Sequence, residues 1–162
     1  MTALIRSAIV NDAPALGALH MACWREAYGA LLSPEFFTRA TPESSAARWA
    51  TAIPRIAADD GVLLLAEDHG ELLGFASAGP ARGEAPPRER ELYALYVRAS
   101  HYGSGLGAQL LEAAIGEQPA SLWVLEQNPR ARAFYERHGF RHDGTHETLP
   151  DFEGLVEVRY VR

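Results

Sequence analysis

The sequence predicts a single-domain α/β (α+β) protein with a mixed, mostly antiparallel central sheet of about seven strands flanked by about four helices. Short apolar runs that suit strands alternate with longer segments whose apolar residues recur at helical spacing. Most neighbouring strands are joined by short connections and should pair antiparallel, whereas one strand-helix-strand unit should pair parallel. With 162 residues, of which 48% are hydrophobic, residues 1–162 are expected to close one core.

The amino-terminal quarter predicts one strand and two helices. Residues 3–10 form a short apolar run, and Asp12 is expected to cap a helix that reaches about Tyr28. A second helix is predicted over roughly 43–53, and Pro54 is expected to end it.

The middle of the chain predicts three strands. Apolar runs at 62–67 and 71–78 flank a short polar turn, which is typical of an antiparallel hairpin. Residues 79–90 are rich in proline and charge and are expected to form a loop. The run ELYALYV at 91–97 is the strongest strand signal in the chain.

The last third predicts two helices and three strands. They are a helix at 105–117, a strand at 121–125, a helix at 129–138 that Gly139 ends, and strands near 140–142 and 155–161.

Charge and cysteine content narrow the class of function. The net charge is −6, which disfavours a nucleic-acid or an anionic membrane partner and suits a cationic or amine substrate. Cys23 is the single cysteine, so no intrachain disulfide is expected, and its place on an apolar helix stripe favours a buried thiol over a nucleophile. With no export signal or long apolar run recognised, we expect a cytoplasmic protein.

Three glycines stand at alternate positions in the run YGSGLGA, from Tyr102 to Ala108, where the helix at 105–117 begins. Glycines there let the backbone aim successive N–H groups at one point, and the helix dipole adds partial positive charge. The arrangement suits a pyrophosphate, and the alternative is a plain glycine-rich turn.

A nicotinamide oxidoreductase is a rival interpretation of this run. Gly103, Gly105 and Ala108 fit the loose dinucleotide pattern, and Glu126 lies near the end of the next strand. That pattern requires the loop to follow its strand at once, whereas residues 98–102 intervene here. The chain also supplies too few strand-helix repeats for a doubly wound fold.

A second motif, NPRARAFYERHGF at 128–140, follows the strand at 121–125. Together with YVRASHYGSGLGAQLL it resembles the GNAT superfamily of acetyl-CoA-dependent N-acetyltransferases, whose motifs are a Q/R-x-x-G-x-G/A loop and an N-x-x-A-x-x-F-Y-x-x-x-G-F helix. The resemblance is close over residues 91–142, and WREAYGALLSPEFF is similar to a segment of some small bacterial members.

The resemblance implies acetyl-CoA as co-substrate. It assigns the pantetheine arm to the strand backbone at Leu95, Tyr96 and Val97, because a strand edge can pair with the arm's amides, and it assigns a polar contact to Asn128. The pyrophosphate falls to the loop residues Tyr102, Gly103, Ser104, Gly105, Leu106, Gly107 and Ala108. Tyr102 replaces the family's Gln or Arg, so we expect the backbone amides rather than this side chain to hold the phosphates.

The resemblance also makes Tyr135 the general acid. Attack of an amine on a thioester expels a thiolate, which a phenol within hydrogen-bond reach can protonate or stabilise. The alternative is that Tyr135 only packs beside Phe134.

Glu91 is the candidate base, acting directly or through water, because an alkylammonium with a pKa of about 10 must lose a proton before it attacks. By strand alternation it is expected to share a face with Tyr93 and Leu95. The alternative is a solvated carboxylate beside Arg88 and Arg90.

The acceptor pocket of this superfamily involves the first helices, which makes Trp24, Tyr28 and Phe36 possible lining residues, or else core residues. No metal site is expected, because Gly139 should separate His138 from His142.

The sequence therefore predicts an enzyme that transfers the acetyl group of acetyl-CoA to a primary amine of a small molecule or peptide. Direct attack in a ternary complex suffices, since a thioester is already activated. The alternative is a non-catalytic acyl-CoA-binding sensor on the same fold. The resemblance also allows a homodimer.

Overall fold

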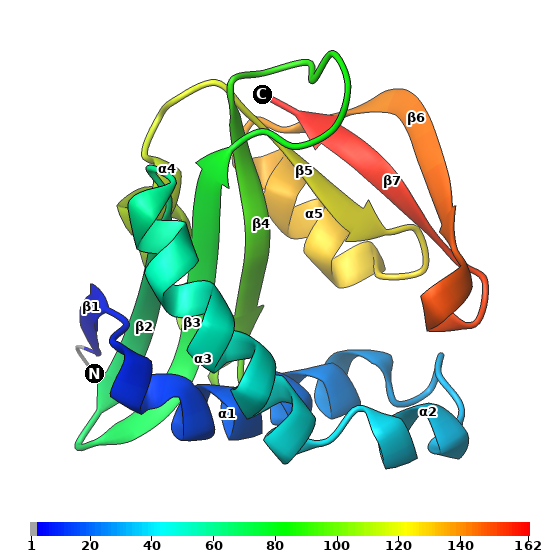
Figure 1. Cartoon of the computed structure of the whole chain (residues 1–162). Coiled ribbons are helices and arrows are strands. Elements are labelled where there is room, and N and C mark those ends of the chain that lie inside the picture. The colour runs from blue at the N-terminus through cyan, green and yellow to red at the C-terminus, as the bar shows by residue number, and fades with distance from the viewer. Residues whose placement is uncertain (1–2) are drawn as a thin grey trace.

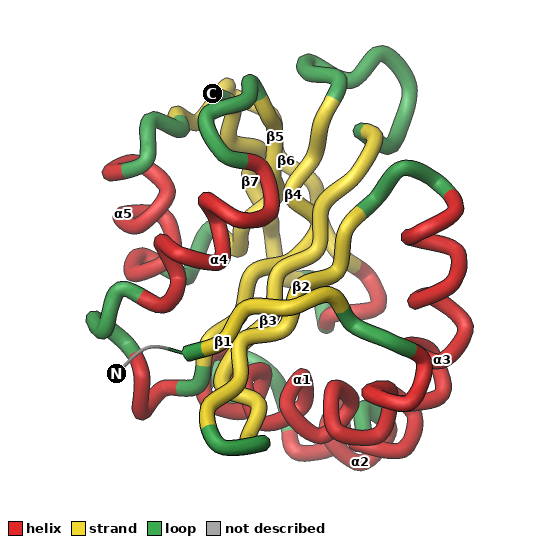
Figure 2. Tube along the Cα trace, turned by 90° about the vertical axis from the view of Figure 1, so that its left-hand side faces the viewer, coloured by secondary structure: helices red, strands yellow, loops and turns green. Residues whose placement is uncertain are grey.

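The computed structural model describes residues 3–162 and places a seven-stranded sheet at the centre, with helices on both faces (Figures 1 and 2). The strands are β1 (Leu4–Ser7), β2 (Val62–Asp68), β3 (Glu71–Pro80), β4 (Arg90–Val97), β5 (Ala120–Leu125), β6 (Arg141–Leu149) and β7 (Leu155–Val161). The α-helices are α1 (Ala13–Tyr28), α2 (Pro34–Arg39), α3 (Pro42–Ala58), α4 (Leu106–Ile115) and α5 (Pro129–Arg137). The predicted mixed α/β fold is confirmed.

The strand order is β1-β2-β3-β4-β5-β7-β6. Five of its neighbouring pairs are antiparallel, including the predicted β2–β3 hairpin, and β4 pairs parallel with β5. This single parallel pair needs a crossover, which α4 supplies. The sheet is therefore antiparallel at both ends and parallel at its centre.

Helices cover the two faces of the sheet with different parts of the core. On one face, the apolar stripe of α4 packs in a cluster with β4, β5, β7 and α5 (Figure 2). On the other face, α1 and α3 pack against Leu65 and Phe75, both fully buried. A third cluster joins α1 and α2 to Phe152 and Leu155 near the start of β7.

The sequence predicted that Asp12 caps α1, but its side chain makes no capping hydrogen bond to the helix. Its carboxylate instead accepts hydrogen bonds from the Arg6 guanidinium, at 2.8 and 2.9 Å, and from the backbone N–H of Ile9 at 2.8 Å. The nearby guanidinium forms charge-assisted bonds that a helix cap does not offer, so Asp12 fixes the short turn before the helix.

The end predicted for the second helix, at Pro54, was wrong, because α3 continues to Ala58. Pro54 lies on the exposed side of α3, where water can hydrogen-bond to the backbone carbonyl that receives no N–H from the proline. Ile53 and Ile56, on either side of it, pack into the core and favour continuation. The helix α2 was not predicted. It is a short helix that begins at a Ser33 cap and has Pro34 in its first turn.

The strand β6 is longer than the predicted run at 140–142. It is an edge strand with mostly exposed residues, so the apolar alternation that marks a strand is missing from its sequence. No helix within residues 3–162 has both the length and the apolar character that crossing a membrane requires.

Gly17 sets the contact between α1 and α3. A Cβ atom at this position would lie 2.5 Å from the backbone nitrogen of Ala46 and 2.6 Å from the carbonyl oxygen of Pro42. We expect Gly17→Ala to destabilise the fold by about 1–3 kcal/mol through overpacking, partly offset by better helix propensity. Ala18→Ser, at the exposed next position, should change the free energy of unfolding by less than about 0.5 kcal/mol. Urea denaturation measures both, and equal stability of the two variants would contradict this account.

Candidate active site

The central sheet opens between β4 and β5. These strands pair only from Arg90 to Leu92 on β4, opposite Ala120 to Leu122 on β5. Beyond Leu92 they diverge, which leaves the β5-facing backbone of β4 without a strand partner. The N–H and C=O groups along this edge are available to a ligand that carries amides.

A β-bulge lies where the two strands part. Ala78 of β3 pairs with Leu92, but its neighbour Ser77 pairs with Ala94, so Tyr93 is an extra residue in β4. A bulge bends its strand and increases the local twist, and the bend here occurs where pairing with β5 stops.

The bulge also overturns the face predicted for Glu91. Leu92 and Leu95 both pack against the α4 and α5 side of the sheet, whereas Ala94 and Tyr96 pack against the α1 side. The extra residue therefore shifts the alternation by one, and Glu91 lies on the side of Ala94 and Tyr96 rather than that of Leu95.

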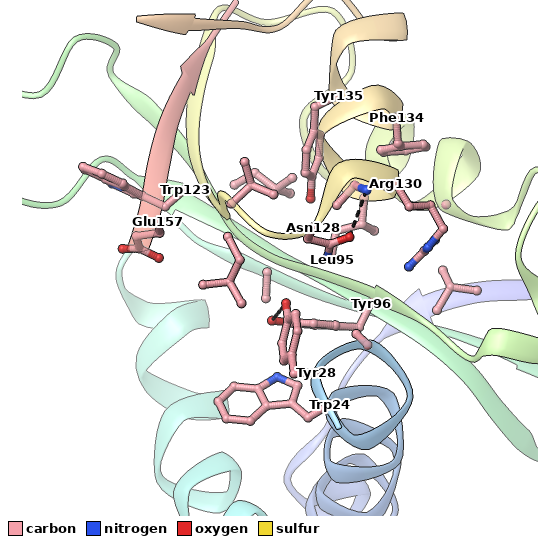
Figure 3. Close-up of a pocket in the computed structure, with 18 of the residues that line it drawn as sticks. Trp24, Tyr28, Leu95, Tyr96, Trp123, Asn128, Arg130, Phe134, Tyr135 and Glu157 are labelled. Atoms are coloured by element: carbon pink, nitrogen blue, oxygen red, sulfur yellow. Dashed lines mark hydrogen bonds between the residues drawn. The ribbon is translucent and has the colours of Figure 1, made fainter. Parts of the chain in front are cut away.

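A cavity of about 820 Å³ occupies the opening (Figure 3). It is lined by most of the residues singled out from the sequence, namely Trp24, Tyr28, Glu91, Leu95, Tyr96, Val97, Tyr102, Gly103, Gly105, Gly107, Ala108, Asn128 and Tyr135. Ser104, Leu106 and Phe36 do not line it. Leu106 belongs to the core beneath α4, and Phe36 stacks behind Trp24 with ring centroids 6.0 Å apart.

The glycine loop presents free amides to this cavity. Gly105 is the N-cap of α4 and adopts φ 87°, in the left-handed region where a side chain is strained. The N–H of Ser104 donates to the carbonyl of His101, and that of Leu106 donates to the Ser104 hydroxyl. Four residues of the loop line the cavity, namely Gly103, Gly105, Gly107 and Ala108. Within residues 3–162 their backbone N–H groups make no hydrogen bond.

Arg130, in the first turn of α5, lies beside this loop. Its guanidinium carbon is 3.4 Å from the centroid of the Tyr102 ring, and both side chains line the cavity. Stacking on the tyrosine holds a positive charge near the free amides. The pairing joins two segments far apart in sequence, which is why the motif alone did not reveal it.

Two predicted residues of α5 face the opening. Asn128 caps the helix, with its side-chain oxygen accepting from the N–H of Ala131 at 3.2 Å. Tyr135 is 7% exposed, and its hydroxyl makes no hydrogen bond to any described residue. Burial raises the pKa of the Tyr135 phenol, and the nearby Tyr28 adds to the increase. The Tyr135 phenol is therefore protonated at neutral pH.

The opposite part of the cavity is aromatic. The Tyr28 and Tyr96 hydroxyls are 3.0 Å apart (Figure 3). The centroid of the Trp24 ring lies 5.2 Å from that of Phe152. Trp123 also lines this part. Phe152 and Trp123 were not predicted, because each comes from a segment that only the fold brings to this cavity.

Two carboxylates and one arginine supply the charge there. Glu91 is 3% exposed and accepts from the Arg82 side chain at 2.7 Å and from the Arg82 backbone N–H at 2.9 Å. Glu157 on β7 also lines the cavity and was missed by sequence reasoning. Burial, followed by repulsion from Glu147, raises the pKa of Glu157 to about 7.

No cluster of three or more His, Cys, Asp or Glu side chains that could hold a metal occurs within residues 3–162. Cys23 is buried in the core, as expected, and burial raises the pKa of its thiol to about 12.

Comparison with known proteins decides the family. The family model described as "Acetyltransferase (GNAT) family" matches residues 15–140. The chain belongs to the GNAT family of acetyltransferases.

Relatives and solved structures agree with this assignment. "Probable N-acetyltransferase Rv2775" of Mycobacterium tuberculosis is 31% identical over 97% of this chain and 90% of its own length. "L-methionine sulfoximine/L-methionine sulfone acetyltransferase" of Pseudomonas aeruginosa is 34% identical over 71% of this chain and 63% of its own length. The PaiA N-acetyltransferase of Thermoplasma acidophilum, solved in complex with coenzyme A, shares the fold with a TM-score of 0.70 at 20% identity, covering 98% of each chain. This GNAT protein is therefore an acyltransferase.

Glu157 should make the stability of this acetyltransferase depend on pH. Because its pKa is raised to about 7 in the folded chain, the folded state binds the proton more tightly than the unfolded state. Its ionisation then lowers the free energy of unfolding as pH rises from about 4.5 to about 7.

We expect Glu157→Gln to unfold at a higher temperature than the wild type at pH 8 and at nearly the same temperature at pH 5. Thermal denaturation at both pH values checks this. A lower unfolding temperature for the variant at pH 8 would contradict the raised pKa.

Proposed function

We propose that this acetyltransferase transfers the acetyl group of acetyl-CoA to a primary amine by direct attack in a ternary complex. The observation that carries the proposal is the continuity of one cavity from the open edge of β4 to the free amides of the glycine loop. A pantetheine arm needs amide partners and a pyrophosphate needs N–H donors, and the cavity offers both in that order.

The coenzyme is assigned residue by residue. The backbone of Leu95 to Val97 pairs with the pantetheine arm, and Asn128 contacts the arm. The free amides of Gly103, Gly105, Gly107 and Ala108 hold the pyrophosphate. Arg130, stacked on Tyr102, supplies the positive charge that Tyr102 itself lacks. The relative from Thermoplasma acidophilum, solved with coenzyme A, supports this choice of ligand.

Tyr135 is the general acid of the proposed reaction. It lies on α5 beside the open edge of β4, and its hydroxyl has no partner among the described residues that a thiolate would have to displace. A phenol with a raised pKa remains protonated until the thiolate leaves.

The acceptor is a primary amine of a small molecule or peptide, with its apolar part against Trp24 and Tyr28. Aromatic rings attract an alkylammonium through the cation–π interaction, and the neighbouring carboxylates add to this attraction. The relative from Pseudomonas aeruginosa is named for amine-bearing sulfoximine and sulfone substrates, which supports a small acceptor.

The prediction that Glu91 is the base stays a prediction. Both of its oxygens already accept hydrogen bonds from Arg82, so an ammonium proton would have to displace one of them. A cytoplasmic location and a homodimer likewise stay predictions. No observation within residues 3–162 favours the non-catalytic sensor.

The activity is tested by thiol release from acetyl-CoA with a panel of primary amines. We expect turnover with at least one amine and Tyr135→Phe to lower kcat by about 100-fold or more, because the leaving thiolate loses its proton donor. Tyr160→Phe is the matched control. Tyr160 is a fully buried tyrosine outside the cavity, bonded to Arg132 and Glu136, so its loss should reduce stability and leave kcat unchanged. Coenzyme binding without turnover on any amine would favour the sensor.

The anion site is tested by Gly105→Ala against Gly70→Ala. Both glycines have positive φ, 87° and 83°, and a Cβ at either would meet no atom closer than 4.0 Å. Each variant should lose about 1 kcal/mol of stability through backbone strain. Only Gly105→Ala should weaken coenzyme A binding, by about 10-fold, since it disturbs the amide array. Calorimetric titration measures both affinities, and equal affinities would place the pyrophosphate elsewhere.

A further inference from the structure

We infer that Glu157 is the base that takes the proton from the acceptor ammonium. This inference rests on the proposed function and names a catalytic residue that the sequence motifs do not contain. It follows from the position of the Glu157 carboxylate in the fold and from the charges around it. It also follows from the hydrogen bonds that already occupy Glu91, the other candidate base.

The strand β7 directs Glu157 toward the acceptor part of the cavity. Val158 and Tyr160, one and three residues after Glu157 on the same strand, are buried against the α4 and α5 side of the sheet. Glu157 therefore points to the other side, where α1 contributes Trp24 and Tyr28. Tyr135 enters from α5, so the proposed base and acid border the same cavity from different elements (Figure 3).

Neighbouring strands place a second carboxylate beside it. Glu157 pairs directly with Glu147 on β6 and with Leu125 on β5. Directly opposed residues of antiparallel strands share a face, so the two carboxylates repel each other. Glu147 does not line the cavity, and its effect on a substrate is exerted through Glu157.

The charged and titratable groups around Glu157 come from four elements. Glu147 faces it from β6, Glu91 from β4, Arg82 from the loop after β3, and Tyr28 from α1. Burial and then Glu147 raise the pKa of Glu157 to about 7, Arg82 opposes the increase, and Glu91 adds to it. A carboxylate with this pKa is ionised in about half of the molecules at pH 7 and binds a proton more tightly than an ordinary glutamate.

Glu157 also has free lone pairs, unlike Glu91. Among the described residues no hydrogen bond is donated to its carboxylate, whereas Glu91 accepts two from Arg82. An ammonium group can therefore bond to Glu157 without displacing a protein donor. In this arrangement Glu91 holds Arg82 in place and Glu157 remains open to the substrate.

The reaction balances with these two residues. The Glu157 carboxylate takes one proton from R–NH₃⁺, and the nitrogen lone pair attacks the thioester carbonyl carbon. The tetrahedral adduct collapses as the C–S bond breaks, and the thiolate takes the proton of the Tyr135 hydroxyl. The second nitrogen proton restores Tyr135, directly or through water, and Glu157 releases its proton to solvent. The products are the N-acetyl amide, coenzyme A thiol and one proton.

The pH dependence of kcat/KM tests this assignment with two matched variants. For the wild type we expect an acidic limb with a midpoint of about 7. Glu157→Gln should lower kcat/KM at pH 8 by about 100-fold and abolish this limb. Glu147→Gln removes the repelling charge but no group that lines the cavity. It should shift the limb to lower pH and lower the rate at pH 8 far less than Glu157→Gln does.

The outcomes separate this inference from the proposed function. An active wild type whose limb persists in Glu157→Gln, or disappears in Glu91→Gln instead, overturns the assignment of Glu157 alone. A limb that does not move in Glu147→Gln also overturns it, because the repulsion would then not act on the base. A wild type that binds coenzyme A but acetylates no amine overturns the proposed function and this inference together. Coenzyme A affinity, measured for each variant, confirms that the variants are folded.

Discussion

The divergence of β4 from β5 is the constraint on which the rest of the site depends. Parallel pairing ends at Leu92, where the bulge at Tyr93 bends β4 away from the line of its neighbour. A sheet that stayed paired would satisfy its own backbone and leave no room at its centre. The opening instead exposes a row of backbone groups beside a cavity. The sheet can tolerate this because β3 still pairs with the other edge of β4 through Val97.

The opening also connects the two faces of the sheet. Tyr135 and Asn128 come from α5 on one face, while Trp24 and Tyr28 come from α1 on the other. A coenzyme and an acceptor can therefore approach from different sides and meet at the level of the strands. Direct transfer needs this geometry, since both substrates must be bound together with the reacting atoms close to each other.

The two ends of the cavity carry opposite charge. The end near the glycine loop carries free N–H groups, the α4 amino terminus and Arg130, which suit an anion. The far end carries the two carboxylates of Glu91 and Glu157 beside Arg82, and the surplus of negative charge suits a cation. The net charge of −6 belongs to the same trend but does not locate either site. The order of donors and acceptors along one cavity is what relates the fold to the proposed chemistry.

The sequence by itself determined the order of the strands and of the helices other than α2, the glycine loop and the motif that contains Asn128 and Tyr135. These are local features, in which spacing and turn chemistry decide the outcome over a few residues. It did not reveal the full length of β6, whose exposed edge lacks apolar alternation, the short helix α2, or the continuation of α3 past Pro54, which packing of Ile56 favours. Only the tertiary structure decided the face of Glu91, the stacking of Arg130 on Tyr102 and the place of Glu157 in the cavity. Each of these depends on a bulge or on contacts between segments far apart in the chain, and such contacts leave no periodic signal in the sequence.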